Sequence, residues 1–366
     1  MMAVLVACSA HFYRRNNHLR FRGGSPFADL REIVAGSLAD STIYLCWGVL
    51  VLVVNRFAVA EFGQGLLPVV ALAASIVEFS IVFDGVGEAL IPVGGMYAGE
   101  DNKPALRTLA NHSALVATAE GVVCGAALGF LAPQIAAGYG FRGESAALMP
   151  EAVRMARTLA FAMPFMGLLM MMNTHYLVVG HVPFAVSVTV MKDFVCPCAG
   201  ALSLGAAFGV RGMWLGFAAG YALAAAYPFL FVRVRHGRGL FPWLIARDDG
   251  RSVDFTVRLT ERSLAAAADR IAAYLDGHGV FGAVVGRVKS VVADMGAATI
   301  GANRRRVACE YFVSLAEKGV ARVVVRDDGR TTGAEVRPPA AAGVTCRRLN
   351  TLGCNRTEYR FDMEAR

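Results

Sequence analysis

A long apolar block constrains this chain more than any other feature of its sequence. Residues 37–232 contain only 8 Lys and Arg and 11 Asp and Glu in 196 positions, whereas residues 233–366 contain 23 and 15 in 134 positions. The block is far below the roughly 25% of charged residues that is usual in soluble domains, and the tail is close to that value. The chain therefore divides into a membrane-like block and a polar tail, and a wholly soluble protein is excluded.

The block contains six stretches that are long enough to cross a bilayer as helices, because each crossing needs about 20 mostly apolar residues. Buried helices of a large soluble protein would be shorter and would carry a polar face, which is missing here. We expect membrane spans at residues 37–57, 66–97, 112–136, 155–179, 184–208 and 213–232.

Basic residues between the spans predict the orientation, because Lys and Arg accumulate on the cytoplasmic side of a membrane. With the leader inside, ten Lys and Arg lie on the cytoplasmic side and five on the other side. These counts predict a multi-pass protein of the inner, cytoplasmic membrane with both termini in the cytoplasm. The lipid bilayer is thus the first expected partner, and no partnership with nucleic acid is expected.

The leader has its apolar run before its basic cluster, which is the reverse of a secretory signal. Residues 1–12 would form a helix of about 18 Å, too short for a membrane core of about 30 Å. Two interpretations remain open. The leader is an interfacial stub, or it is the end of a helix whose beginning is absent from a truncated chain, which we favour.

Ionisable residues inside a membrane are costly, so each one is a functional candidate. Asp84 and Glu88 lie one helical turn apart on one face of the second span, where two carboxylates at low dielectric would bind a proton or Na⁺. Alternatively, they line an aqueous cavity or pair with a neighbouring helix. Glu78 and Glu120, in the second and third spans, are further candidates.

The fourth and fifth spans add polar candidates. The fourth is rich in methionine, which suits a lining for varied apolar ligands as well as packing against lipid, and it carries Asn173 and His175. In the fifth span Lys192 and Asp193 are adjacent, and we expect them to neutralise each other at the membrane interface. The eight cysteines include no C-x-x-C pair, so neither a disulfide framework nor a zinc site is expected.

The order of these features resembles the C-terminal half of a transporter of the MATE (multidrug and toxic compound extrusion) family. The resemblance covers about residues 1–238 and rests on GVGEALIPVGGMYAG at 85–99, Met163-Pro164 and VRGMWLG at 210–216. It implies a cation-coupled antiporter for small organic substrates, cationic ones included, with Na⁺ or H⁺ as the coupling ion. It also implies a second lobe or a homodimer, because alternating access needs two bundles. The fourth span lacks the acidic residue that family members often carry.

The polar tail is long enough for a core of its own and reads as an α/β sandwich. Alternation of apolar and polar residues predicts strands, and apolar residues at helical spacing predict helices. We expect strands at 253–259, 307–314, 320–326 and 358–363, helices at 263–278 and 284–298, and a loop from 327 to about 344.

The tail resembles the histidine-kinase-like (Bergerat) ATPase domain, in the small form found in anti-sigma-factor kinases. The resemblance rests on RDDG at 326–329 and on NRTEYR at 355–360. It implies that Asp327 accepts the adenine amino group and that Gly329 and Gly333 belong to the phosphate lid. It also implies that the helix carrying Asp294 lies where Mg²⁺ is held.

The catalytic parts of that domain are poorly preserved. Ala298 stands where an Asn would hold the metal, and the lid is poor in glycine, so few backbone amides would cradle a triphosphate. We therefore expect no catalytic residue, no metal site and no ATP or Mg²⁺ cofactor. The chain is then not an enzyme, and the tail is a degenerate interaction module.

These inferences divide the chain into three parts: a partial helix end with a basic cytoplasmic linker (1–36), a six-span transporter-like domain (37–238) and a cytoplasmic ATPase-like domain (252–366). The favoured function is that of half a MATE-like antiporter for drugs or metabolites. The alternative is a membrane-anchored regulatory or signalling protein, whose spans only localise a nucleotide-binding tail.

Overall fold

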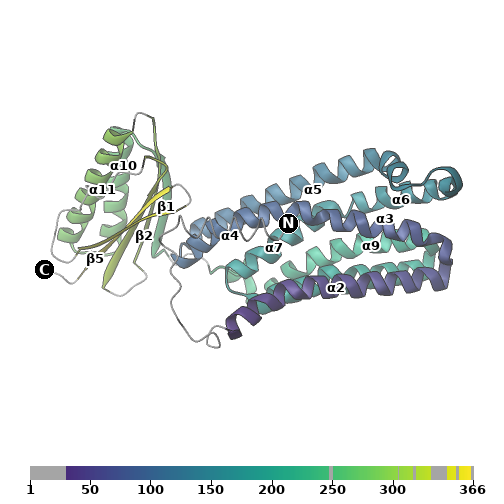
Figure 1. Ribbon diagram of the computed structural model, residues 1–366. Helices are drawn as coiled ribbons and strands as arrows, with labels where there is room; N and C mark the ends of the chain where they lie inside the picture. The colour runs from purple at the N-terminus through teal and green to yellow at the C-terminus, as the bar shows by residue number, and fades with distance from the viewer. Residues whose placement is uncertain are drawn as a thin grey trace.

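A computed structural model describes residues 30–246, 250–303, 305–315, 319–330, 344–351 and 354–363. They form an elongated bundle of helices with an α/β domain at one of its ends (Figure 1). The expectations for residues 1–29 and for Gly333 lie outside the described residues.

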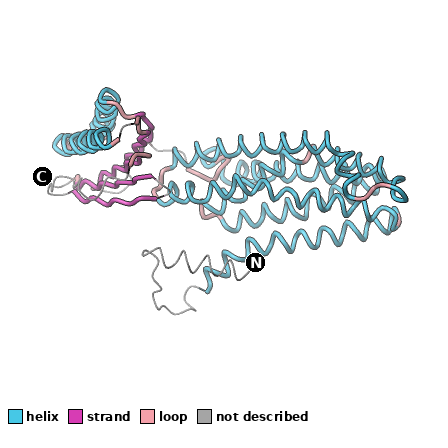
Figure 2. The backbone as a smooth tube through the Cα atoms, turned by 45° about the horizontal axis from the view of Figure 1, so that its top comes forward, coloured by secondary structure: helices cyan, strands magenta, loops and turns pink. Residues whose placement is uncertain are grey.

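The bundle consists of apolar helices that run along one common direction (Figure 2). Short 3-10 segments, η1 (Gln64–Leu66), η2 (Phe79–Phe83) and η3 (Gly143–Leu148), and a π-helical segment, η4 (Met191–Val195), separate some of them. The α-helices are α2 (Leu30–Phe62), α3 (Leu67–Glu78), α4 (Asp84–Gly99), α5 (Lys103–Tyr139), α6 (Met149–Ala160), α7 (Met163–Val178), α8 (Val182–Val190) and α9 (Cys196–Leu240).

Four helices of the described residues are long and apolar enough to cross a membrane: Ser41–Phe62, Gln64–Gly99, Lys103–Tyr139 and Val182–Leu240. A fifth crossing is obtained if α6, with the end of η3, and α7 count as one span bent by 46°. The fifth and sixth predicted spans lie within one helical stretch of 59 residues, on the two sides of a break at Gly209.

That stretch is broken at Gly209, where φ is 68° and ψ is −155°, a conformation that glycine adopts without strain. The two sides then run antiparallel in close contact. A Cβ added at Gly200 would collide with the carbonyl of Gly216, and a Cβ at Gly220 would lie 2.5 Å from the carbonyl oxygen of Cys196. The stretch is therefore a helical hairpin, and glycines let its two backbones approach.

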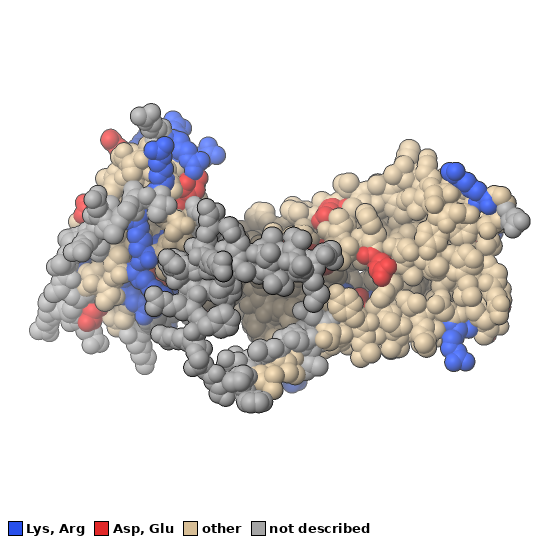
Figure 3. Space-filling model, viewed as in Figure 1, with Lys and Arg blue, Asp and Glu red and all other residues tan. Residues whose placement is uncertain are grey.

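The same small-residue packing joins α5 to α7. A Cβ at Gly121 would lie 2.6 Å from the carbonyl oxygen of Met163, and one at Gly167 would lie 2.5 Å from that of Ala117. On the face of the bundle seen in Figure 3, the described residues are mostly uncharged, with few charges along the length of the bundle. Exposed Leu115, Phe130 and similar side chains on this surface suit contact with lipid.

The C-terminal domain has one sheet and two helices. The strands are all antiparallel and lie in the order β1-β2-β3-β5-β4. The elements are β1 (Ser252–Arg258), α10 (Glu261–Gly277), α11 (Gly282–Ala302), β2 (Ala308–Ser314), β3 (Val320–Asp327), β4 (Val344–Thr351) and β5 (Cys354–Asp362). The expected strands and helices are present, and β4 is an additional strand that the sequence did not predict, because VTCRRLNT carries few apolar residues.

Both helices cover the same face of the sheet, away from the bundle (Figures 1 and 2). Their apolar side chains, such as Ile271 and Val288, form a core with Tyr311, Val323 and Phe361 of the strands. The opposite face of the sheet is turned toward the end of the bundle. This arrangement brings polar side chains of β2, β3 and β5 to the turn between α4 and α5.

Candidate functional site

The second span contains a break beside its acidic pair. The helix passes from α3 into η2 and resumes as α4 at Asp84, and a 3-10 segment within a helix often marks a hinge. Asp84 is half-buried, and Glu88, one turn later on the same face, is exposed. Among the described residues no hydrogen bond or ion pair engages either carboxylate, so both have oxygens free to accept a ligand.

A second break carries opposite charges. Lys192 and Asp193 lie in the π-helical segment η4, between α8 and the first half of α9. The Lys192 ammonium lies 2.7 Å from Oδ1 and 2.6 Å from Oδ2 of Asp193. The expected neutralisation is confirmed, but the lysine is buried, with an exposed fraction of 4%.

The charges of the second break act on the acidic pair of the first. Lys192, Glu88 and Asp193 all act electrostatically on the Asp84 carboxylate. We call Asp84, Glu88, Lys192 and Asp193 the charged cluster. Its formal charge is −2 when every group is ionised, and net negative charge at low dielectric attracts a cation or a proton.

Other predicted candidates lie outside this cluster. Glu78 is exposed at the end of α3, and Glu120 is half-buried on α5. Asn173 is buried, and its Oδ1 accepts a hydrogen bond of 3.1 Å from the Thr189 hydroxyl. That bond ties α7 to α8, so the structure places Asn173 in a contact between helices.

His175 is fully buried and contacts the segment that follows α9. Its Nε2 donates to the carbonyl oxygen of Trp243 at 2.9 Å, and the Tyr176 hydroxyl donates to that of Pro242 at 3.2 Å. We call residues 241–246 the connector, because they lead from the bundle to the sheet. The contacts of His175 are therefore with the connector and not with the charged cluster.

Helix α5 holds the connector from a second side. The Arg107 guanidinium donates to the carbonyl oxygen of Ile245 at 2.7 Å, and the Trp243 indole donates to Asn111 Oδ1 at 2.7 Å. Trp243 and Ile245 are buried, with exposed fractions below 5%. The connector is thus a packed element of the bundle.

The contact between the sheet and the turn joining α4 to α5 was not predicted from the sequence. Glu100, in that turn, is 4% exposed and forms ion pairs with Arg326 of β3 and Arg356 of β5. Arg322 Nη1 donates to the Glu100 carbonyl oxygen at 3.0 Å. We call this contact the Glu100 dock. Arg and Glu residues that alternate along a strand are typical of a solvent-exposed face, so this pattern did not predict the Glu100 dock.

Glu310 of β2 extends the dock toward α4. It accepts a hydrogen bond of 3.2 Å from the Tyr97 hydroxyl and pairs with Arg326 Nη1 at 2.8 Å, while the Arg326 guanidinium lies 4.8 Å from the centre of the Tyr97 ring. Burial, and then the neighbouring Asp254 carboxylate, raise the pKa of Glu310 to about 7. The dock is therefore sensitive to pH near neutrality.

The residues that resemble an ATPase site take part in local contacts. Asp327 is 4% exposed, and its Oδ1 accepts hydrogen bonds from the Gly329 amide at 3.0 Å and from Asn355 Nδ2 at 2.8 Å. Asp294 is exposed on α11, with Ser290 3.4 Å away. In the described part of the chain, no group of three or more His, Cys, Asp and Glu is arranged to hold a metal ion.

Solved structures of MATE transporters share the fold of the bundle. A MATE in its straight conformation has a TM-score of 0.57 and 22% identity over 64% of this chain and 53% of that one. A MATE in complex with MaL6 has a TM-score of 0.56 and 22% identity over 61% and 51%. A multidrug resistance MATE family transporter of the MOP superfamily, in an outward-facing conformation, has a TM-score of 0.54 and 25% identity over 59% and 49%.

The chain spans about half the length of these transporters. No family model matches the sequence, and no curated protein matches it either. The helical part of the chain is thus a multi-pass membrane bundle with the fold of about half a MATE transporter, and the expected resemblance is confirmed for that part at the level of fold.

Proposed function

We propose that the bundle is one lobe of a MATE-like antiporter that exports small organic cations in exchange for Na⁺ or H⁺. The charged cluster carries the proposal. It lies where two membrane helices are interrupted, and interrupted helices form the ion and substrate sites of many secondary transporters. Two carboxylates without a partner among the described residues, beside a third that is already paired, suit a site that binds and releases a cation.

We infer that the bundle crosses the membrane six times. The bent pair of α6 and α7 counts as one crossing, and the hairpin at Gly209 counts as two. With six crossings, the start of α2 and the end of α9 lie on the same side, which the basic residues predict to be the cytoplasm of a cell with this protein in its inner membrane.

A second lobe completes the proposed transporter. Alternating access requires two bundles that rock about a site between them. We propose that a second copy of the chain, or a separate lobe, packs against the face that presents Asp84 and Glu88.

We infer that the C-terminal domain is a docking module and not an active ATPase. The buried, hydrogen-bonded Asp327 supports this inference, because an adenine amino group needs an accessible carboxylate. The Glu100 dock supports it as well, because it gives the sheet a partner within the chain. The alternative of a signalling protein with a nucleotide-binding tail has no comparable support.

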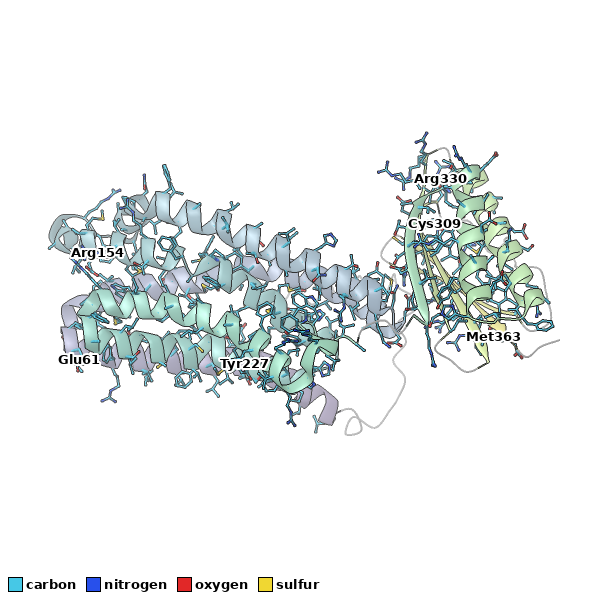
Figure 4. All side chains as sticks on the ribbon, turned by 180° about the vertical axis from the view of Figure 1, so that it is seen from behind. Glu61, Arg154, Tyr227, Cys309, Arg330 and Met363 are labelled. Atoms are coloured by element: carbon cyan, nitrogen blue, oxygen red, sulfur yellow. The ribbon has the colours of Figure 1, made fainter. Side chains whose placement is uncertain are left out.

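The test is export of ethidium from cells that produce the full chain. We expect Asp84→Asn and Glu88→Gln each to lower gradient-dependent export by about tenfold or more, because each removes a charge that holds the coupling cation. Glu61→Gln is the matched control, since Glu61 lies at the end of the bundle away from the sheet (Figure 4).

Export that is unchanged in both variants, with wild-type amounts of protein in the membrane, would remove the acidic pair from the mechanism. An effect as large in Glu61→Gln would show that any loss of a carboxylate impairs the bundle. Absence of export in the wild type would contradict the proposed function itself.

A further inference from the structure

Three arginines at the end of α9 carry a positive charge that nothing in the described part of the chain balances. Arg233, Arg235 and Arg238 are exposed, and none of them forms a hydrogen bond or an ion pair with a described residue. Residues 227–246 contain no Asp or Glu. We call these three residues the arginine cluster. Its charge attracts an anion from outside the described protein.

The outer side of α9 shows where the hydrocarbon of the membrane ends. Leu223, Leu230 and Val234 are 63%, 65% and 76% exposed. They lie on one side of the helix, because residues four and seven positions apart share a face. We call them the apolar stripe. Val234 is the last exposed large apolar residue of α9, and the arginine cluster flanks it, so the hydrocarbon ends at the level of the cluster.

Aromatic rings gather around the turns of α9 that lead into the arginine cluster. The centre of the Phe231 ring lies 4.8 Å from that of Phe184 in α8, 5.8 Å from that of Tyr227 and 6.3 Å from that of the His236 imidazole. The Tyr227 hydroxyl donates to Ser187 Oγ at 3.1 Å. Amphipathic aromatic side chains such as tyrosine are enriched at the interface between membrane and water. The aromatic contacts therefore place the end of α9 at this interface, independently of the apolar stripe.

A break in the helix keeps the third arginine near the other two. At Gly237, φ is 66° and ψ is −158°, a conformation that glycine adopts without strain. The chain then returns to the bundle as the connector, which α5 and α7 bind through hydrogen bonds. Arg238 therefore stays beside the end of the helix instead of leading away from it. Arg233 and Arg235 differ by only about 3 Å along the helix axis.

We propose that the arginine cluster binds the phosphate headgroup of an anionic phospholipid, in the leaflet on the sheet side of the bundle. Guanidinium groups donate paired hydrogen bonds to phosphate oxygens, and basic residues next to a membrane helix attract anionic lipids. The acyl chains of that lipid lie along the apolar stripe, which a free anion does not use. The site goes beyond the proposed function, because it requires only that the bundle spans a membrane and not that the protein transports a cation.

Photocrosslinking in lipid nanodiscs tests the site at its own position. The full chain carries Val234→p-benzoylphenylalanine, and the nanodiscs contain equal amounts of phosphatidylglycerol and phosphatidylcholine with identical acyl chains. An arginine near an anionic surface contributes about fivefold to lipid binding, so we expect crosslinks to phosphatidylglycerol to exceed those to phosphatidylcholine by about fivefold or more. The ratio should fall to within about twofold of one in the triple variant Arg233→Gln, Arg235→Gln, Arg238→Gln. The same probe at Phe130 of α5, which is 87% exposed, should give a ratio near one throughout.

A charge-matched triple variant distinguishes a site from diffuse attraction. Arg56→Gln, Arg142→Gln and Arg211→Gln together remove the same charge from exposed arginines of three separate segments of the bundle. This variant should keep the wild-type crosslinking ratio at Val234 within about twofold. An equal loss in both triple variants, or a ratio near one in the wild type, would overturn the proposal. Loss of the ratio on addition of inorganic phosphate would overturn it as well, because a free anion would then suffice.

Thermal unfolding of the full chain in detergent gives a readout without a crosslinker. A ligand that binds only the folded protein raises Tm. We expect phosphatidylglycerol to raise Tm more than phosphatidylcholine does, and the triple variant of the arginine cluster to lose this difference while it keeps its Tm in phosphatidylcholine, since its side chains are exposed. A difference that persists in this variant would contradict the site. Absence of ethidium export with both lipid effects intact would refute transport and leave the lipid site standing.

Discussion

At the scale of residues, the polar side chains of the bundle are positioned either by spacing along one helix or by packing between distant helices. Asp84 and Glu88 could be placed on one face, because residues four apart on a helix are neighbours. The electrostatic interaction of Asp84 with Lys192 could not be predicted, since it depends on how helices far apart in the chain pack together. His175 was expected as a polar candidate of the fourth span, and its bond to Trp243 could be found only once the path of the connector was known.

Glu310 gives the dock a pH dependence. Its raised pKa of about 7 means that the docked sheet holds a proton that an exposed glutamate, with a pKa of 4.5, has lost. This contribution to docking is complete below about pH 4.5 and is lost as the pH rises through about 7. We expect hydrogen-exchange protection factors at residues 97–103 to fall between pH 6 and pH 8.

Glu310→Gln should keep those protection factors constant over the same range, because an amide does not titrate. Exposed Glu261→Gln serves as the control and should show the wild-type dependence. A Glu310→Gln protein whose protection still falls with pH would assign the titration to another group.

At the scale of elements, the lengths of the apolar stretches predicted where helices lie, whereas the breaks in the helical backbone could not be predicted. Lengths alone placed the first three long apolar helices, but the sequence did not predict that η4 would be a π segment within a helical stretch. Strand β4 was missed because its residues are mostly polar. β4 is held in the sheet by pairing with β5 along its whole length, and this pairing cannot be recognised from the residues of β4 alone.

The hairpin at Gly209 depends on the glycines at its contact. Gly216→Ala would place a methyl group against the backbone of Gly200, and such overpacking costs about 1–3 kcal/mol or more. We expect a lower Tm for the purified protein. Gly48 of α2 has open space around it, so Gly48→Ala should leave Tm unchanged or raise it slightly, through helix propensity. Equal Tm values for the two variants would mean that the two halves of the hairpin can move apart without loss of stability.

At the scale of the whole molecule, composition distinguished the helical bundle from the C-terminal domain, but the sequence did not predict that the two are in contact. The outer face of the sheet carries Arg322, Arg326 and Arg356 among glutamates, a pattern typical of a solvated surface. In the structure, Glu100 of the bundle lies among these arginines. Which charged face will meet a partner is decided by three-dimensional complementarity, which a single sequence does not display.

Removal of the Glu100 charge should release the domain. Glu100→Gln leaves two buried guanidinium groups short of a carboxylate, and breaking a buried ion pair costs about 3–5 kcal/mol. We expect protection of the turn between α4 and α5 to fall by more than tenfold in hydrogen exchange. The adjacent Asp101 is exposed, and its carboxylate forms a surface ion pair with Lys103 at 3.6 Å. Because surface ion pairs contribute little to stability, Asp101→Asn should have little effect. Equal effects of the two variants would contradict the importance of the dock.

The connector and the dock together make α5 a lever. The C-terminal domain contacts Glu100, in the turn that leads into this helix. The connector contacts the helix itself at Arg107 and Asn111, about two turns further along. Two separated points of attachment transmit torque as well as force. A rotation of the sheet must therefore either move the end of α5, together with the helices that α5 contacts, or break one of the two attachments.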